Sequence, residues 1–266
     1  MLFGGAWALG LLGLTFALFW QPGGDRLAYW STVAQPLYQH AEFTKYDFLY
    51  SPVVAQMLYP LSRLPWLVFW ELFAVVGVAN FAWLLAPLGW TFGLPLFLAV
   101  LPVAIHGNLE WLMALVVVLG FRYPAVWAMP LLTKVSPGVG LLWFAVRREW
   151  RALAIALAFT TAATGLSFMF APGLWFDWLG MLWENAHTHG DGWSMLPIPL
   201  LWRGVLGAVV IAWGARENRR WTLLVGVMLA RPDLLPAELS MLATLPRLVR
   251  AERRAWAPAW RFAKLA

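Results

Sequence analysis

Long apolar runs separated by short polar stretches dominate the hydropathy pattern of this chain. A helix that crosses a bilayer needs about 20 mostly apolar residues, and several of the runs reach that length. We therefore predict an all-α, polytopic integral membrane protein with a single transmembrane domain over residues 1–266. The predicted apolar runs cover residues 2–20, 66–86, 94–121, 123–146, 152–170, 196–213, 221–230 and 234–245.

Polar residues interrupt three of these regions. The interruptions are His106-Gly107-Asn108 with Glu110, Lys134 with Ser136-Pro137-Gly138, and Arg231-Pro232-Asp233. Each apolar half has on the order of 10–14 residues, which is too short to span, so we predict short hairpins and ten membrane segments. An alternative with 94–121 and 123–146 as single spans also satisfies the loop charges. It leaves Asn108, Glu110 and Lys134 deep in lipid.

The loop charges orient the chain. Cytoplasmic loops of membrane proteins carry an excess of Lys and Arg. If every interruption is an extracytoplasmic turn, the basic residues of 147–151, of 216–220 and of the C-terminal tail 247–266 all fall inside. We therefore expect a multi-pass plasma-membrane protein with both termini cytoplasmic, a first outer loop over 21–65 and a second outer loop over 171–195.

Composition narrows the class further. Hydrophobic residues make up 62% of the chain and charged residues 12%, which excludes a soluble globular enzyme and a disordered chain. The chain has no cysteine, so disulfides, a thiolate nucleophile and a cysteine metal site are excluded. The net charge of +6 is explained by cytoplasmic loops, so we expect no nucleic-acid partner. The first apolar run lacks a basic leader and a cleavage site, which favours an uncleaved helix over a signal peptide.

The predicted topology places the histidines and most of the acidic residues at the outer face. Several cations also fall there, against the positive-inside preference, and such cations commonly bind an anion. This asymmetry indicates an extracytoplasmic site at the membrane surface for an anionic, lipid-borne substrate. The outer cations are Arg26, Lys45, Arg63, Lys134, Arg203 and Arg231.

A series of short motifs resembles glycosyltransferase family 87, the DUF2029 group of GT-C membrane glycosyltransferases. The motifs run in order over most of the chain. They are Asp25-Arg26-Leu27-Ala28-Tyr29, Pro36-Leu37-Tyr38, Phe48-Leu49-Tyr50-Ser51-Pro52, Gly107-Asn108, Lys134-Val135-Ser136-Pro137 and Arg147-Arg148-Glu149-Trp150-Arg151-Ala152, with Ser194 and Arg203 as a weaker match. The chain is shorter than typical members.

The resemblance implies a GT-C-like fold and a mannosyltransferase-like activity. The sugar would move from a polyprenyl-phosphate donor to a lipid or glycan acceptor on the outer side, with inversion, without a nucleotide sugar and without a cofactor. It also implies that Asp25 is the catalytic general base. The chemistry agrees, because inversion needs a carboxylate that takes the acceptor proton and a cation that stabilises the departing phosphate. No glycine-rich phosphate loop is present, which favours a lipid-linked donor.

Each candidate residue has a plainer interpretation. Asp25 can be a helix N-cap, and Asn108, a candidate sugar ligand, can cap the helix that follows it. Tyr29 and Tyr50, also candidate substrate ligands, can belong to an aromatic belt. Lys134 can extend its amine to the headgroups.

The donor-phosphate site is predicted at Lys134 and Arg203, supported by Arg231 and His187. His189 is a candidate substrate ligand. The segment His187–Asp191 also has ligand types that can hold a metal ion, but its spacing fixes no further ligand, so we expect no metal. Two other functions stay open: a secondary transporter, whose site would lie at the bilayer midplane, and a truncated inactive relative that only binds lipid-linked sugar.

Overall fold

The computed structural model describes residues 2–19, 24–30, 32, 37–38, 48–134, 136–188, 194–232, 234 and 236–262. Within its helices, the side chains of residues 19, 24–25, 137, 185–188 and 254–262 lie outside that description. The described part of the chain is helical and contains no β-strand, which confirms the predicted all-α class.

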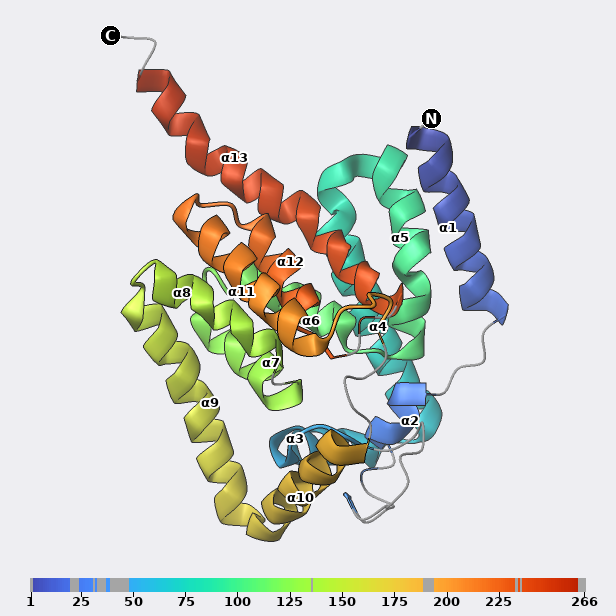
Figure 1. Ribbon diagram of the computed structural model, residues 1–266. Coiled ribbons are helices and arrows are strands. Elements are labelled where there is room, and N and C mark those ends of the chain that lie inside the picture. Colours follow the sequence, from blue (N-terminus) through green and yellow to red (C-terminus); the bar gives the residue numbers. More distant parts are fainter. Residues whose placement is uncertain are drawn as a thin grey trace.

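Figure 1 shows how the helices are arranged in space. The N-terminal part consists of α1 (Leu2–Phe19), α2 (Gly24–Trp30), α3 (Pro52–Ser62), α4 (Trp66–Leu85), the 3₁₀ helix η2 (Ala86–Leu88), α5 (Gly89–His106) and α6 (Glu110–Leu119). The C-terminal part consists of η3 (Pro124–Trp127), α7 (Ala128–Thr133), η4 (Ser136–Leu141), α8 (Leu142–Val146), α9 (Trp150–Phe170), α10 (Pro172–Thr188), α11 (Leu200–Arg216), α12 (Trp221–Leu229), η5 (Pro236–Thr244) and α13 (Leu245–Phe262).

Two helical stretches are long and apolar enough to cross a membrane, Trp66–His106 and Trp150–Phe170. Their outward side chains are apolar as well: Met169 is 81% exposed and Phe170 is 78% exposed at the end of α9. Exposed apolar surface of this extent is stable against lipid and not against water. These features confirm the membrane character of the protein, while the count of ten membrane segments stays a prediction.

Small residues bring α1, α4 and α5 into close contact. A Cβ atom added to Gly10 on α1 would lie 2.6 Å from the carbonyl oxygen of Pro95 on α5. On the other side of α5, a Cβ atom added to Gly77 on α4 would lie 3.2 Å from the Cβ atom of Ala104. Close backbone approach at small residues is typical of helices that pack within a membrane, because it maximises van der Waals contact.

Helices end at each of the three predicted interruptions. α5 ends at His106, α7 ends at Thr133, and α12 ends at Leu229, two residues before Arg231. The start of one helix differs from the prediction. α5 begins at Gly89, five residues before the predicted run 94–121, because the φ of +66° at Gly89 lets the chain reverse after η2. With 18 residues α5 is about 27 Å long, so it is not a short half-helix.

The two predicted outer loops contain helices. The loop 21–65 holds α2 and α3, and the loop 171–195 holds α10. Trp175, Trp178 and Met181 recur every three residues along α10 and are buried, so α10 packs on one face. The Trp178 indole donates a 3.2 Å hydrogen bond to the carbonyl of Leu49. Figure 1 shows α2, α3 and α10 together at one end of the molecule, with the α8–α9 turn and α13 toward the other end.

Candidate functional site

Four charged side chains meet in the interior and form an ion cluster, Glu110, Lys134, Arg231 and Glu238. Both terminal nitrogens of Arg231 donate to the two carboxylate oxygens of Glu110, with 2.6 Å between Nη2 and Oε1. Lys134 Nζ lies 3.3 Å from Glu110 Oε1, and Arg231 Nη2 lies 3.2 Å from Glu238 Oε1. With two cations and two carboxylates, the ion cluster balances its own charge.

The helix breaks place these charges where the backbone favours them. Glu110 is the first residue of α6, and a carboxylate at a helix N-terminus is stabilised by the helix dipole. Lys134 directly follows α7 and Arg231 follows α12, and cations are favoured at C-terminal ends. The side-chain oxygen of Asn108 accepts a 3.2 Å hydrogen bond from the Glu110 backbone N–H. The Asn108 side chain therefore binds the first residue of α6, while Leu109 occupies the N-cap position.

Arg203 supports the ion cluster from behind. Its guanidinium is fully buried and donates to three backbone carbonyls: Ile198 at 3.0 Å, Arg231 at 2.8 Å and Pro232 at 3.1 Å. These bonds hold the non-helical backbone between α12 and η5. Because each nitrogen of the guanidinium is engaged, the contacts of Arg203 position Arg231 and present no open edge to a ligand.

Two tyrosines connect the ion cluster to α2. The hydroxyl groups of Tyr29 and Tyr50 lie 3.0 Å apart and both residues are buried. The Tyr50 phenol is also an electrostatic neighbour of Lys134 and Arg231. Four predicted site residues, Tyr29, Tyr50, Lys134 and Arg231, are therefore brought together from α2 and from segments up to about 200 residues apart.

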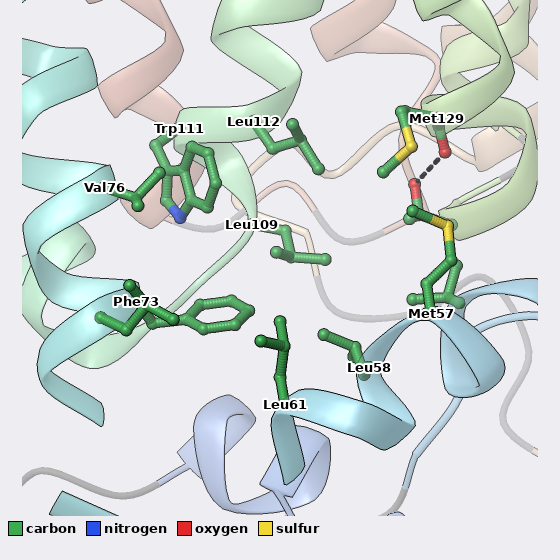
Figure 2. Close-up of a pocket in the computed structure, with 12 residues that line it drawn as sticks. Met57, Leu58, Leu61, Phe73, Val76, Leu109, Trp111, Leu112 and Met129 are labelled. Atoms are coloured by element: carbon green, nitrogen blue, oxygen red, sulfur yellow. Dashed lines mark hydrogen bonds between the residues drawn. The ribbon is translucent and has the colours of Figure 1, made fainter. Parts of the chain in front are cut away.

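An apolar cavity of about 320 Å³ is lined by residues that neighbour two members of the ion cluster along the chain. Its walls are side chains of α3, α4, α6 and α7 that converge on open space (Figure 2). The one polar side chain in its lining is Thr133, whose hydroxyl donates a 2.8 Å hydrogen bond to the carbonyl of Met129. Leu109 and Thr133 line the cavity and directly precede Glu110 and Lys134. The apolar cavity and the ion cluster are thus formed by neighbouring residues of the chain.

Arg26 is a second buried cation and lies outside the ion cluster. None of its surface is exposed, and its guanidinium stacks 4.7 Å from the ring of Trp70 on α4. Its stem passes across Gly107, where a Cβ atom would collide with Arg26 Cγ. Its only hydrogen bond to the described residues is a long one, 3.5 Å from Nη1 to the carbonyl of Trp70. Burial lowers the pKa of Arg26 from its ordinary value to about 10, so the group stays charged at neutral pH.

The remaining predicted site residues are only partly placed. Asp25 belongs to α2 and His187 to α10, but both side chains lie outside the described residues, as does the whole of His189. The two helices lie at the same end of the molecule (Figure 1). Among the residues that the structure describes, no group of three or more His, Asp or Glu side chains has the arrangement of a metal site.

The sequence analysis missed the carboxylate partners of the ion cluster. It placed Glu110 and Glu238 among the acids at the outer face, although isolated charges inside a membrane protein are expected to pair. The signal was present in the sequence, because each of Glu110, Lys134 and Arg231 lies at a break in an apolar run. The pairing rule applied to these three residues predicts their ion pairs. The sequence places Arg26 among the outer cations, but no pattern in the sequence predicts that it is buried.

Comparison with protein families places the chain. The model of glycosyltransferase family 87 matches residues 48–266, which include the ion cluster and the apolar cavity, while Asp25, Arg26 and Tyr29 precede the match. Neither the curated proteins nor the solved structures give a match. Because the family model covers well over half of its length, and because its surface is that of a membrane protein, the chain belongs to glycosyltransferase family 87 and is a membrane glycosyltransferase.

Proposed function

We propose that this glycosyltransferase takes its sugar from a polyprenyl-phosphate donor and transfers it to a lipid or glycan acceptor on the extracytoplasmic side of the plasma membrane. The observation that carries the proposal is the apolar cavity together with the ion cluster. A polyprenyl phosphate has a long apolar chain joined to one phosphate, and the segments 109–112 and 129–134 carry both the lining of the apolar cavity and two members of the ion cluster. We propose a mannosyltransferase-like specificity on the resemblance of the motifs alone.

The proposed reaction is a single displacement with inversion. The acceptor hydroxyl attacks the anomeric carbon, its proton passes to the carboxylate of Asp25, and the bond from the anomeric carbon to the phosphate oxygen breaks. The electron pair of that bond stays on the phosphate, which gains a second negative charge. A general base contributes about 10²- to 10⁴-fold to such a step. Tyr29 lies one helical turn after Asp25 on α2 and is a candidate contact of the sugar, as is His189 in the second outer loop.

Lys134 is the member of the ion cluster best able to meet the departing phosphate. Its side chain keeps 23% of its surface exposed, against 1% for Arg231 and none for Glu110. It holds Glu110 by a single contact, while Arg231 uses both terminal nitrogens. We therefore propose that Lys134 stabilises the developing charge, that Arg231 and Arg203 hold the ion cluster in place, and that His187 supports the phosphate from α10.

The test of this function uses the purified protein with decaprenyl-phosphate mannose and a lipid acceptor, and follows sugar transfer. Asp25→Asn keeps the size and the capping ability of the side chain and removes the proton acceptor. Turnover should fall by about two to four orders of magnitude while donor binding stays. Asp177→Asn, an exposed acid on α10 at the same end of the molecule, is the matched control and should keep normal turnover.

Three results would redirect the proposal. Transfer from a nucleotide sugar instead of the lipid-linked donor would overturn the donor class. Normal turnover of Asp25→Asn would leave Asp25 as a helix cap and move the base to another outer acid. Tight donor binding with no transfer by the wild-type protein to any acceptor would favour the alternative of a relative that only binds lipid-linked sugar.

A further inference from the structure

Arg26 has an unusual deficit of partners for a buried charge. Buried charged groups in proteins are normally paired and hydrogen-bonded, because an uncompensated charge away from water is costly. Neither Nε nor Nη2 of Arg26 has a hydrogen-bond partner among the described residues, and the stacked Trp70 indole nitrogen lacks one too. The described part of the chain thus buries the Arg26 guanidinium and leaves two of its three nitrogens without a hydrogen bond.

The two free donors of Arg26 form one edge of the guanidinium. Nε–H and one N–H of Nη2 point in the same direction, and this parallel pair is the edge that binds a carboxylate or a phosphate through two oxygens. Nη1, on the other side, is the nitrogen that donates to the carbonyl of Trp70. Stacking on Trp70 fixes the plane of the guanidinium. The edge is therefore pre-oriented for an anion with two oxygens.

The surroundings of Arg26 are built for this position. Gly107 adopts a φ of +79°, and any side chain there would occupy the path of the Arg26 stem. The ion cluster offers no comparable edge, because its two carboxylates already balance Lys134 and Arg231. Among the described buried cations, Arg26 is the one with an open pair of donors.

We propose that Arg26 binds the phosphate of the polyprenyl-phosphate donor through its Nε and Nη2 edge. This inference rests on the proposed function and deepens it, because it separates the phosphate anchor at Arg26 from the charge-stabilising amine at Lys134. Arg26 directly follows Asp25 in α2, so a phosphate held there keeps the sugar close to the helix that carries the proposed base.

The test compares two ligands that differ only in the phosphate, decaprenyl phosphate and decaprenol, on the purified full-length protein in neutral detergent. The wild-type protein should bind decaprenyl phosphate about tenfold or more tightly, the size expected for charge-assisted bonds. Arg26→Met keeps an apolar stem across Gly107, removes the guanidinium, and should bind both ligands alike. Arg63→Met is the matched control, since Arg63 stacks on Tyr59 at the same 4.7 Å but is exposed, and it should keep the preference.

The outcomes separate this inference from the proposed function. If the wild-type protein prefers decaprenyl phosphate and Arg26→Met keeps that preference, the anchor is elsewhere and the lipid-linked donor survives. If the wild-type protein has no preference, both proposals fail. Excess phosphatidylglycerol serves as a competitor. If it abolishes the Arg26-dependent preference, Arg26 binds the phosphate of bulk phospholipid, and the proposal that it binds the polyprenyl-phosphate donor is overturned.

The melting temperature provides a second readout. Without ligand, Arg26→Met should melt at or above the wild-type temperature, because the substitution removes an uncompensated buried charge. A clear drop in melting temperature would instead show that Arg26 is structural and would overturn the inference.

Discussion

Arg26 and Arg231 are both fully buried guanidinium groups, yet their surroundings differ in one respect. Arg231 donates to two carboxylates, while Arg26 meets an indole ring and one distant carbonyl. They also flank the same turn, since Arg26 crosses Gly107 and Arg231 binds Glu110 three residues later. Burial alone therefore does not reveal the role of a charge. The presence or absence of a compensating partner does.

The compensated charges act as a cross-link. Glu110, Lys134 and Arg231 each lie at the end of a helix, so their ion pairs join three backbone breaks that have no regular hydrogen bonding of their own. Irregular backbone is tolerated at membrane depth where it is buried in protein. Arg26 forms no ion pair with the described residues, and on our proposal its free edge binds the donor phosphate.

Removing the shared carboxylate should produce the largest effect on stability. Glu110→Gln leaves Lys134 and Arg231 with Glu238 as their only acid, and breaking a buried pair typically costs about 3–5 kcal/mol. We expect a large fall in melting temperature in detergent. Glu149→Gln is the matched control, because the Arg147–Glu149 pair is 2.6 Å long but a third or more exposed, so it should cost about 1 kcal/mol or less. Equal melting temperatures for the two variants would contradict the comparison.

A substitution at Gly107 should affect the two cations unequally. Gly107→Ala places a Cβ atom in the path of the Arg26 stem and strains a left-handed backbone, at a cost of about 1–3 kcal/mol. We expect the preference for decaprenyl phosphate over decaprenol to disappear. Gly165→Ala on α9, where a Cβ atom meets nothing within 4 Å, is the control. A retained phosphate preference in Gly107→Ala would show that Arg26 does not need its present position.

Lys134 should separate transfer from binding. Lys134→Met removes one contact of Glu110 and leaves both contacts of Arg231, and the Lys134 amine is the least buried of the four charges, so stability should fall less than in Glu110→Gln. Turnover should fall by about ten- to a hundredfold, because the lost charge acts on the departing phosphate. Donor binding should be kept, in contrast to Arg26→Met. Parallel losses of binding and turnover would make Lys134 a second phosphate anchor.

The smallest effect concerns pH. Only the protonated form of Arg26 binds a phosphate, and the pKa of Arg26 is lowered by burial to about 10. The preference for decaprenyl phosphate should therefore be level from about pH 7 to about pH 9 and fall as the pH rises through or above about 10. Stability has the opposite dependence on pH. In the unfolded chain Arg26 has its ordinary, higher pKa and keeps its proton above about pH 10, so its contribution to the free energy of unfolding rises with pH there. Loss of the phosphate preference as the pH rises through about 6–7 would instead indicate that a histidine binds the phosphate.

Much of the architecture was predictable because it depends on local composition. The apolar runs that become α1, α4 and α9 were located within a few residues, and the breaks at His106, Lys134 and Arg231 mark the ends of α5, α7 and α12. The segment 171–195 was harder. Its polar residues suggested a loop, but the buried Trp175 and Trp178 make most of it the packed helix α10. The exposed face of α10 mixes the apolar Phe176, Leu179 and Trp183 with Asp177 and Glu184, so the segment lacks the unbroken apolar run that marks a membrane span.

The sequence by itself determined the class of protein, because a bilayer imposes long apolar helices and a charge asymmetry that are visible in composition. It also predicted candidate residues for the chemistry of glycosyltransferase family 87, and their roles stay predictions. Only the tertiary structure decided how those residues are partnered. Arg231 meets Glu110 across 121 residues, and Lys134 meets it across 24. Such contacts arise from packing between helices, and Arg26 differs from Arg231 only by the neighbours that packing supplies.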